Sequence, residues 1–529
     1  MLDFCPYDFK KMDVNNLAYE LTFLKEWDWN IVKKKTVLAL YGKIDRLKFI
    51  NEKDNKRYRG DKRNNNKTHV MVLGNSGGKS GFKIFQEIIE YCNEKAIDKW
   101  KKELINSEDQ DDFEYDEEGF WWNEIDETTD TMKKISFHKN GNGTYTFEAD
   151  SQPVMYAIPC CPHCHNRLPI GWDIAEDFGA VSLMGRSGSG KTTYLLSMMH
   201  NWKMFPSLHD KHDRQQLNIT AAHLVEDTED VLYAEMKQAS EKMCCLNGEC
   251  PDNTNTESPI PPVFLKIMYG DHTMIIGIYD NAGENLRKMD TEGNPNLKLI
   301  LHKYVFAEFY LFDPEDLNIN LPKQKEQVML KKCEMLSLEE QGKYQVQNLN
   351  KCRSGEELLE EMASISVNNR KKQDIFEVYN SRYRVLMQER SLYDLKNKYF
   401  LGIIIKSDLL EPIEEIKEKY SLLFEREALS DMLNADSMTM REELVKEMIE
   451  NFNLIDPEMV NQIELDFGEI NLDGTSTGRR TVSWHCISAL GCDTDEDGRL
   501  LGEYAPIRVA EPLVTCILKR IADIQWTRR

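Results

Sequence analysis

A glycine-rich turn between an apolar strand and a helical run constrains this chain more than any other feature. Gly185, Gly190, Lys191 and Thr192 match the spacing G-x-x-x-x-G-K-[ST], directly after the apolar run 179–184. Glycines let the backbone curl so that successive N–H groups face one anion, and the helix that follows adds its positive N-terminal end. The stretch therefore predicts a phosphate-binding loop. The alternative is a glycine- and serine-rich loop that fits the pattern by chance.

The chemistry of such a loop assigns roles to single side chains. Lys191 would reach the β- and γ-phosphates of a nucleotide, and the Thr192 hydroxyl would occupy one coordination position of Mg²⁺. The residues expected to line the nucleotide here are Gly185, Arg186, Ser187, Gly188, Ser189, Gly190, Lys191, Thr192 and Thr193.

Composition restricts the class of protein. The chain has 529 residues, a net charge of −23 and 41% hydrophobic residues, which is enough for several packed cores but opposes direct nucleic-acid binding. No run approaches the ~18 apolar residues of a membrane span, and the N-terminus has no basic, apolar signal sequence. Thirteen cysteines in so long a chain do not form the pattern of a disulfide framework. We expect a cytoplasmic protein with protein or nucleotide partners, and an oligomer is compatible with this composition.

From residue 171 to 529 the pattern predicts one α/β domain. Apolar strands alternate with helical stretches, and the runs 263–269 and 273–279 are separated by Gly270-Asp271 in the manner of an antiparallel hairpin. Two charged helical insertions are expected. The remaining predicted elements are strands 217–222, 305–312, 400–405 and 481–488, helices 191–203 and 229–243, insertions about 323–398 and 411–463, and a final amphipathic helix about 506–525.

Residues 1–170 predict a small zinc-ribbon-like module with a large α+β insertion at about 9–159. Cys161-Pro-His-Cys164 has the spacing of a turn that presents two thiolates to one tetrahedral Zn²⁺. Cys5 and Asp8 repeat that spacing, with a carboxylate in place of the second thiolate. His163 or His165 could also contribute, and a pair of unmetallated cysteines in a turn is the alternative to structural zinc.

Two further stretches within 9–159 attract attention. Gly74 and Gly78-Lys79-Ser80 imitate the phosphate loop but have three residues between the glycines instead of four, so a plain strand–turn–helix is expected. Residues 107–130 are strongly acidic and contain Trp121-Trp122, which predicts a solvated loop, with a partner-binding segment as the alternative.

Three further motifs follow apolar strands in a fixed order. Asp280-Asn-Ala-Gly283 matches D-x-x-G, Lys406-Ser-Asp408 matches K-x-D, and Ser488-Ala489 follows the last strand. Each is weak alone, but strand C-termini are where open α/β sheets bind ligands. With the phosphate loop, this series resembles that of the Ras-like (TRAFAC-class) GTPases, and the hairpin before Asp280 supports that class over other P-loop NTPase folds. The resemblance implies a P-loop NTPase fold with a mixed sheet that is mostly parallel and has one antiparallel hairpin pair.

A closer resemblance, to the double-GTPase family of bacterial conflict systems, covers about 160–529. It is carried by the N-terminal Cys-Pro-Tyr, by Cys161-Pro-His-Cys-His before the phosphate loop, by Tyr-Asp-Asn-Ala-Gly-Glu at 279–284, by Phe-Asp-Pro at 312–314 and by Arg508-Val-Ala-Glu-Pro-Leu513. This resemblance implies a switch in a multi-protein antiviral defence or stress system, with helical insertions and an acidic surface available to protein partners.

The resemblance implies roles for residues outside the loop. Asp280 would hold Mg²⁺ directly or through water, and the Gly283 amide would contact the γ-phosphate. Asp408 would accept hydrogen bonds from guanine, the Lys406 stem would cover the base, and backbone amides of the segment Ser488, Ala489 and Leu490 would donate to guanine O6. Thr256 is the candidate for a switch threonine on Mg²⁺, and Arg186 is a candidate arginine finger.

Two positions depart from the family pattern. Ile405 replaces the usual Asn, which could loosen guanine selectivity, and Glu284 replaces a water-positioning Gln, which predicts slow hydrolysis of GTP to GDP. The expected function is therefore that of a GTPase switch. An ATPase on the same fold and a nucleotide-gated assembly scaffold with little turnover are the alternatives.

Overall fold

The computed structural model describes part of the chain. The described residues are 2–7, 10–13, 17–23, 47–50, 69–72, 135–140, 144–149, 152–163, 166–186, 188–201, 208–209, 216–222, 224–225, 228–229, 231–245, 248–251, 262–280, 304–314, 317, 375, 378–380, 398–425, 435–471, 475–478, 480–492, 494 and 498–527.

The chain divides into two compact units. The first comprises Met1–Phe178, Ala221–Tyr233 and Phe264–Ile276, and the second comprises Gly179–Thr220, Ala234–Val263 and Gly277–Arg529. Cys5 and Cys161 belong to the first unit. The described residues expected around a nucleotide belong to the second.

The described strands of the N-terminal region form an antiparallel sheet in the order β2-β3-β1-β6-β5-β4. Its longest strand, β6, pairs with β1 along the whole of that strand, and Tyr156 and Ile158 of β6 are buried against Ile170. The bounds are β1 Ala18–Phe23, β2 Leu47–Ile50, β3 His69–Val72, β4 Ile135–Lys139, β5 Tyr145–Ala149 and β6 Gln152–Cys160. The predicted turn at 74–80 and the acidic stretch 107–130 lie outside the described residues.

A second, larger sheet is mixed and mostly parallel, as the sequence predicts. Among the described strands its order is β16-β15-β14-β7-β13-β12-β9-β8, and β7, β14, β15 and β16 pair in parallel. The bounds are β7 Asp177–Met184, β8 Leu208–His209, β9 Gln216–Ala221, β12 Val263–Tyr269, β13 His272–Asp280, β14 Val305–Phe312, β15 Tyr399–Ile404 and β16 Val482–Cys486. A short pair, β10 Leu224–Val225 and β11 Thr228–Glu229, is separate from it.

The central strands of the larger sheet form because their sequences are apolar at successive positions. Central parallel strands are covered on both faces, so they are apolar at successive positions instead of alternating. All eight positions of β14 are buried, as are the last seven of β7. Confirming the predicted hairpin, β12 and β13 are neighbours joined by the two residues Gly270 and Asp271.

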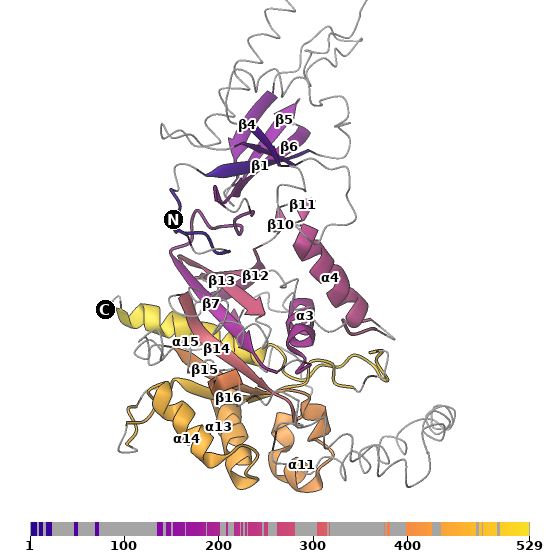
Figure 1. Ribbon diagram of the computed structural model, residues 1–529, viewed down its shortest axis with the longest axis vertical. Helices are drawn as coiled ribbons and strands as arrows, with labels where there is room; N and C mark the ends of the chain where they lie inside the picture. The colour runs from indigo at the N-terminus through magenta and orange to yellow at the C-terminus, as the bar shows by residue number, and fades with distance from the viewer. Residues whose placement is uncertain are drawn as a thin grey trace, which may run out of the picture. The chain divides into compact units, whose positions relative to one another are not determined.

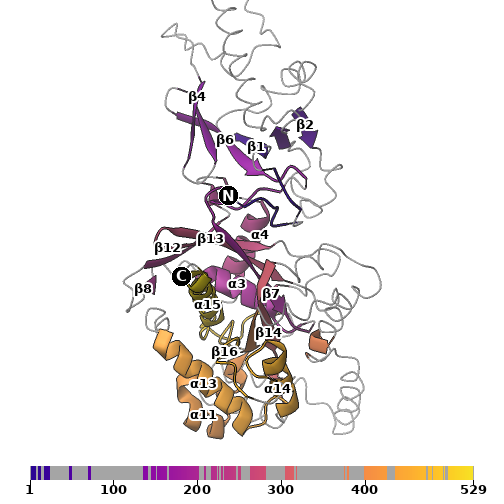
Figure 2. The same ribbon diagram turned by 90° about the vertical axis from the view of Figure 1, so that its left-hand side faces the viewer.

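Helices pack around this sheet (Figures 1 and 2). Both views place α11, α13 and α14 next to one another, and their apolar faces meet a core that includes Phe400, Phe467 and Trp484. In the predicted insertion 411–463 the described helices are α11, α13 and most of α14, whereas the insertion about 323–398 lies outside the described residues apart from 375, 378–380 and 398. The bounds are α3 Lys191–Asn201, α4 Val231–Met243, α11 Glu414–Tyr420, α13 Ala435–Asn451, α14 Pro457–Asp466 and α15 Glu511–Thr527.

The final helix begins later than the sequence predicts. Ile507 exchanges backbone hydrogen bonds with Ser488, and Arg508 has a left-handed backbone with φ 52°. Neither conformation belongs in a helix, so α15 begins at Glu511. Pro512 then lies in the first turn, where its missing N–H is tolerated.

The order of the strands creates a switch point at β7. The neighbours of β7 are β13 on one side and β14 on the other, although β13 and β14 are consecutive among the described strands of the large sheet. In open α/β sheets, ligands bind outside the carboxyl ends of the strands at such a point. The glycine-rich turn after β7 lies at this position.

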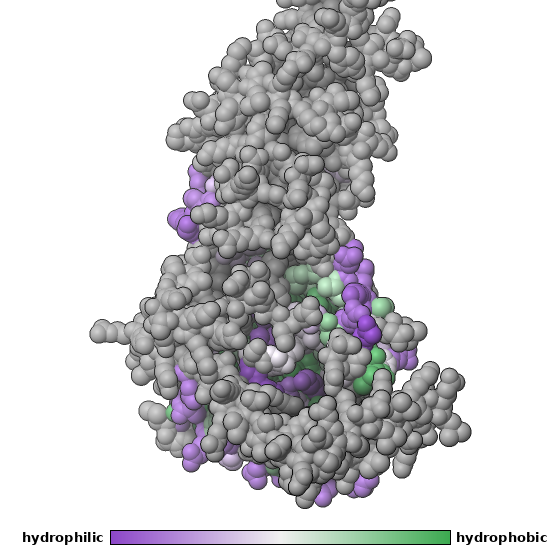
Figure 3. All heavy atoms as spheres, turned by 45° about the vertical axis from the view of Figure 1, so that its right-hand side comes forward, coloured by the Kyte–Doolittle hydropathy of each residue, from purple (hydrophilic) through white to green (hydrophobic). Residues whose placement is uncertain are grey.

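None of the described helices has the length and apolar character needed to cross a bilayer. In Figure 3, apolar residues appear in small groups among hydrophilic ones. The exposed large apolar side chains within the described ranges, Ile174, Leu422, Met440 and Leu501, are single positions spread along the sequence.

Candidate functional site

The turn between β7 and α3 has the backbone of an anion cradle. Gly188 and Gly190 have φ values of +77° and +80°, which other residues adopt only with strain. The backbone N–H of Tyr194 donates to Gly190 O, so α3 begins directly at the end of the turn. The Ser189 hydroxyl is fully buried and has no hydrogen-bond partner among the described residues. An anion in the turn would satisfy it. Ser187 lies outside the described residues.

Lys191 points back over this turn. Its ammonium group is buried and donates to the backbone oxygens of Gly185, at 2.9 Å, and Arg186, at 2.8 Å. Charge-assisted hydrogen bonds of this kind fix a long side chain in one rotamer. The cation is therefore held at the mouth of the loop, where phosphate oxygens could replace the carbonyl oxygens.

Thr192 meets the end of β13. Its hydroxyl donates to Asp280 Oδ2 at 3.0 Å, although 88 positions separate the two residues. Burial raises the pKa of the Asp280 carboxyl above its usual value, against the lowering effects of Lys191 and of the Thr192 hydrogen bond. A divalent cation would offset that burial. A hydroxyl and a carboxylate are oxygen ligands of the kind that Mg²⁺ prefers, so this pair fits the ion.

Gly283, Glu284 and the switch-threonine candidate Thr256 lie outside the described residues. Thr193 is in the first turn of α3 and is partly exposed.

A carboxylate outside the phosphate loop, the D-x-x-G and the K-x-D motifs lies at the end of β14. Asp313 is completely buried, and its Oδ2 atom lies 2.6 Å from Lys406 Nζ and 3.4 Å from Arg186 Nη2. It therefore connects the phosphate loop with the K-x-D segment. Its sequence signal is an acidic residue directly after an apolar strand, in Phe312-Asp313-Pro314.

The K-x-D segment follows β15 in an unusual backbone conformation. Lys406 has φ 52°, and the single 3₁₀ turn Ser407–Leu409 places Asp408 next to the end of β16. The Ser488 hydroxyl donates to Asp408 Oδ1 at 2.6 Å and accepts from the Gly491 N–H at 2.9 Å. This chain of contacts fixes the orientation of the buried Asp408 carboxylate.

The segment Ser488–Leu490 is also anchored to α3. The Ser197 hydroxyl donates to the Ala489 backbone oxygen at 2.7 Å, and Ala505 N–H donates to the backbone oxygen of Leu490 at 2.9 Å. The backbone oxygens of Ala489 and Leu490 are thus both hydrogen-bonded. Because Ser197 belongs to α3, the helix that begins at the phosphate loop also fixes the segment that would bind the base.

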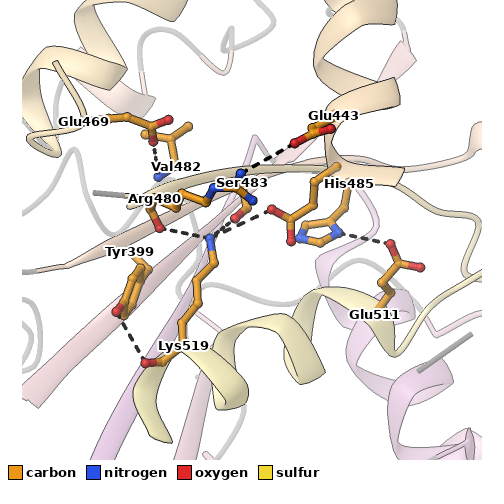
Figure 4. A network of polar contacts seen from close by, with 10 residues as sticks. Tyr399, Glu443, Glu469, Arg480, Val482, Ser483, His485, Glu511 and Lys519 are labelled. Atoms are coloured by element: carbon orange, nitrogen blue, oxygen red, sulfur yellow. Dashed lines mark hydrogen bonds and ion pairs between the residues drawn. The ribbon is translucent and has the colours of Figure 1, made fainter. Parts of the chain in front are cut away.

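A separate polar network fixes the elements behind this loop (Figure 4). Glu511 lies 2.9 Å from Arg441 Nε and 3.6 Å from His485 Nδ1, and these side chains of α15, α13 and β16 are buried. Lys519 donates to Ser483, and burial lowers the pKa of this lysine. The network joins helices to β16, so we interpret it as structural.

In the first unit, two turns have matching hydrogen bonds. The Cys5 N–H donates to Lys10 O and the Cys161 N–H to Asn166 O, both at 2.9 Å. The thiols accept from the residue two positions later, Cys5 from Tyr7 N–H at 3.4 Å and Cys161 from His163 N–H at 3.3 Å. The His163 ring contacts Lys11 O at 3.1 Å, which brings the turns together.

These turns fit a thiolate site. Backbone N–H groups aimed at sulfur favour its ionised, metal-binding form. Asp8, Cys164 and His165 lie outside the described residues, and within the described part of the chain no group of three or more potential ligands occurs.

Comparisons with known proteins give no family for the chain. No model of a protein family matches it, and no curated protein is significantly similar to it.

Proposed function

We propose that this protein binds GTP with Mg²⁺ and hydrolyses it slowly to GDP as a molecular switch. One observation carries the proposal. The carboxyl ends of five neighbouring strands bring polar groups to one edge of the sheet. In sheet order these are Asp280 at the end of β13, the glycine-rich turn with Lys191 and Thr192 after β7, Asp313 after β14, and Asp408 with Ser488 after β15 and β16. Each of these groups has a contact that a nucleotide would extend or replace.

The chemical roles follow from these contacts. Loop amides, the Ser189 hydroxyl and Lys191 would bind the phosphates, and Mg²⁺ held by Thr192 and Asp280 would neutralise charge on the β- and γ-oxygens. Asp408, oriented by Ser488, would accept from the N1–H and N2–H₂ groups of guanine, which adenine does not present in that arrangement. Hydrolysis would transfer the γ-phosphoryl group to water. Glu284, the residue after the D-x-x-G motif, would orient the attacking water molecule.

The resemblance extends the proposal to a cellular role. A switch in a multi-protein bacterial defence or stress system would use its helical insertions to contact partners. In the cycle, segments near the γ-phosphate would order with GTP and be released after hydrolysis.

Nucleotide preference tests the proposal most directly. We expect GTP to bind at least tenfold more tightly than ATP in Mg²⁺, and Asp408→Asn to weaken GTP about 10- to 100-fold, since hydrogen bonds to a charged group contribute about 1.5–3 kcal/mol each. The Asn amide would instead donate to the 2-oxo group of xanthine, so the variant should gain affinity for XTP. Equilibrium titration with fluorescent nucleotides measures all three.

Two alternatives are outcomes of the same experiment. Tighter binding of ATP than of GTP by the wild type would indicate an ATPase instead of a GTPase. Ile405, which stands in place of the usual Asn, motivates this alternative. Intact GTP binding without phosphate release in a single-turnover assay would indicate an assembly scaffold. Asp456→Asn, an exposed helix-capping position distant in sequence from the motifs, is the matched control and should change neither affinity.

We also propose that the two turns of the first unit bind one structural Zn²⁺. Cys5 and Cys161 would be ligands, and the sequence spacing supplies Asp8 and Cys164 as the remaining two. The matched N–H···S hydrogen bonds of the two turns support this proposal.

A further inference from the structure

Asp313 is in an unusual position for a carboxylate. It directly follows β14, its side chain is 1% exposed, and two cations from different segments approach the same oxygen atom. Lys406 comes from the K-x-D segment after β15, and Arg186 is the second residue of the glycine-rich turn after β7. The carboxylate thus joins two loops that are separated by more than 200 positions in the sequence.

The backbone beside Asp313 is joined at the same place. The Ile405 N–H donates to the Phe312 backbone oxygen at 3.0 Å. The next residue of each segment is paired through its side chain, Lys406 with Asp313. Lys406 is held at φ 52°, a left-handed conformation that costs a residue with a side chain about 1–3 kcal/mol. Such a conformation persists only where surrounding contacts determine it.

The charges make the arrangement interdependent. Arg186 is 8% exposed at its side chain, so its charge is compensated mainly by groups inside the protein, whereas Lys406 is 45% exposed. Removing one partner of a buried ion pair leaves the other charge uncompensated. One buried carboxylate therefore contributes to the position of both the phosphate loop and the K-x-D segment.

We propose that Asp313 is a positioning residue that couples the phosphate loop to the purine-reading segment and thereby supports guanine discrimination. This inference rests on the proposed function. Asp313 holds the left-handed turn at Lys406, which sets the place of Asp408 two residues later. Arg186 serves as the anchor of the phosphate loop in this arrangement, with Asp313 as its partner.

The expected effect separates positioning from general stability. Asp313→Asn keeps the shape of the side chain and removes its charge, which leaves two cations near the triphosphate. GTP affinity should fall about fivefold or more, in the range of typical coupling between sites, because Asp408 loses its position. ATP affinity should stay the same or rise, since its triphosphate meets more positive charge. A variant with only damaged folding would lose affinity for both nucleotides.

A second variant tests the same link and leaves the buried carboxylate of Asp313 in place. Lys406→Met retains an unbranched stem over the base and removes only the ammonium group that reaches Asp313. It should reduce the ratio of GTP to ATP affinity by a similar factor, and the Asp313→Asn/Lys406→Met double variant should show less than the product of the two single effects. Glu411→Gln, which removes the carboxylate of the exposed Lys417–Glu411 pair, is the matched control and should leave the ratio unchanged.

The outcomes are distinct. If the wild type binds neither nucleotide or prefers ATP, the proposed function fails. If the wild type prefers GTP and both Asp313→Asn and Lys406→Met leave the preference intact, or if their effects multiply independently, the coupling role of Asp313 is wrong and the proposed function stands. If Asp313→Asn does not fold, Lys406→Met decides the question.

Discussion

At the scale of single residues, identical side chains acquire different properties from their surroundings. Lys191 is buried against two backbone oxygens, whereas Lys406 is half exposed and reaches a buried carboxylate. Asp280 is the residue whose ionisation bears most directly on the proposed magnesium site. Its carboxyl is buried beside a hydroxyl and a lysine, and burial is the stronger influence on its pKa.

This balance predicts opposite effects of Asp280→Asn on stability and on binding. The pKa of the carboxyl is raised in the folded state, so folding disfavours its ionised form. The free energy of unfolding of the nucleotide-free wild type should therefore rise as the pH falls from the raised pKa to the ordinary value of 3.8. Asparagine resembles the neutral acid, so the variant should be at least as stable as the wild type at neutral pH and lack this contribution. Urea unfolding at several pH values measures it.

The same substitution should abolish magnesium-dependent GTP binding, since an amide is a poorer ligand for Mg²⁺ than a carboxylate. In the wild type, the magnesium-dependent part of the affinity should decline on acidification at a higher pH than for an ordinary carboxyl. A variant that is less stable at neutral pH and still binds Mg²⁺-GTP like the wild type would contradict both expectations.

At the scale of elements, the sheet is determined by how side chains of neighbouring strands fit. Gly402 of β15 pairs in register with Trp484 of β16. A Cβ atom at Gly402 would lie 2.2 Å from the indole ring, so the glycine provides the room in which the ring packs against Phe400 and Phe312. The strands that carry the K-x-D and Ser-Ala segments are therefore held together by a small residue facing a large one.

Gly402→Ala should lower the free energy of unfolding by about 1–3 kcal/mol, the usual effect of overpacking a core. In a Trp484→Phe background the ring is smaller, so Gly402→Ala should lower the free energy of unfolding by less. A double-mutant cycle measured by denaturant unfolding gives the difference between the two effects. Equal costs in the two backgrounds would show that the indole is not what excludes the methyl group.

At the scale of the whole molecule, each polar site lies within one compact unit. The described residues of the proposed nucleotide site all belong to the second unit, and the two thiol turns belong to the first. The proposed zinc would therefore stabilise the first unit and have no direct part in nucleotide binding. Structural metal sites contribute directly to folding free energy.

We expect purified protein to contain about one zinc per chain, and a strong chelator should lower the unfolding temperature without changing the affinity for GTP. Cys161→Ser should lose the metal. Cys160→Ala is the matched control, because the neighbouring Cys160 thiol donates to Ile158 O instead of accepting from a backbone N–H. Elemental analysis of the three proteins measures this, and less than about a tenth of a zinc per chain in the wild type would retire the site.

Much of the fold can be read from local patterns. The apolar run of β14 is predicted to the residue, and the β12–β13 hairpin to within one position, because continuous apolar runs and a Gly-Asp turn are local signals. The start of α15 could not be read in this way. Its sequence is amphipathic from residue 506, but pairing of Ile507 with Ser488 takes the preceding residues out of the helix.

By itself, the sequence determined which segments form strands and helices and where the glycine-rich turn interrupts them, since these depend on periodicity and backbone preference. Tertiary structure alone decided that Asp313 pairs with Arg186 and Lys406, that Thr192 meets Asp280 and that Ser488 orients Asp408. The reason is physical. Parallel strands bring carboxyl ends that are distant in the sequence to one edge of the sheet. The order of the strands, which no local pattern encodes, decides which of these ends lie next to one another.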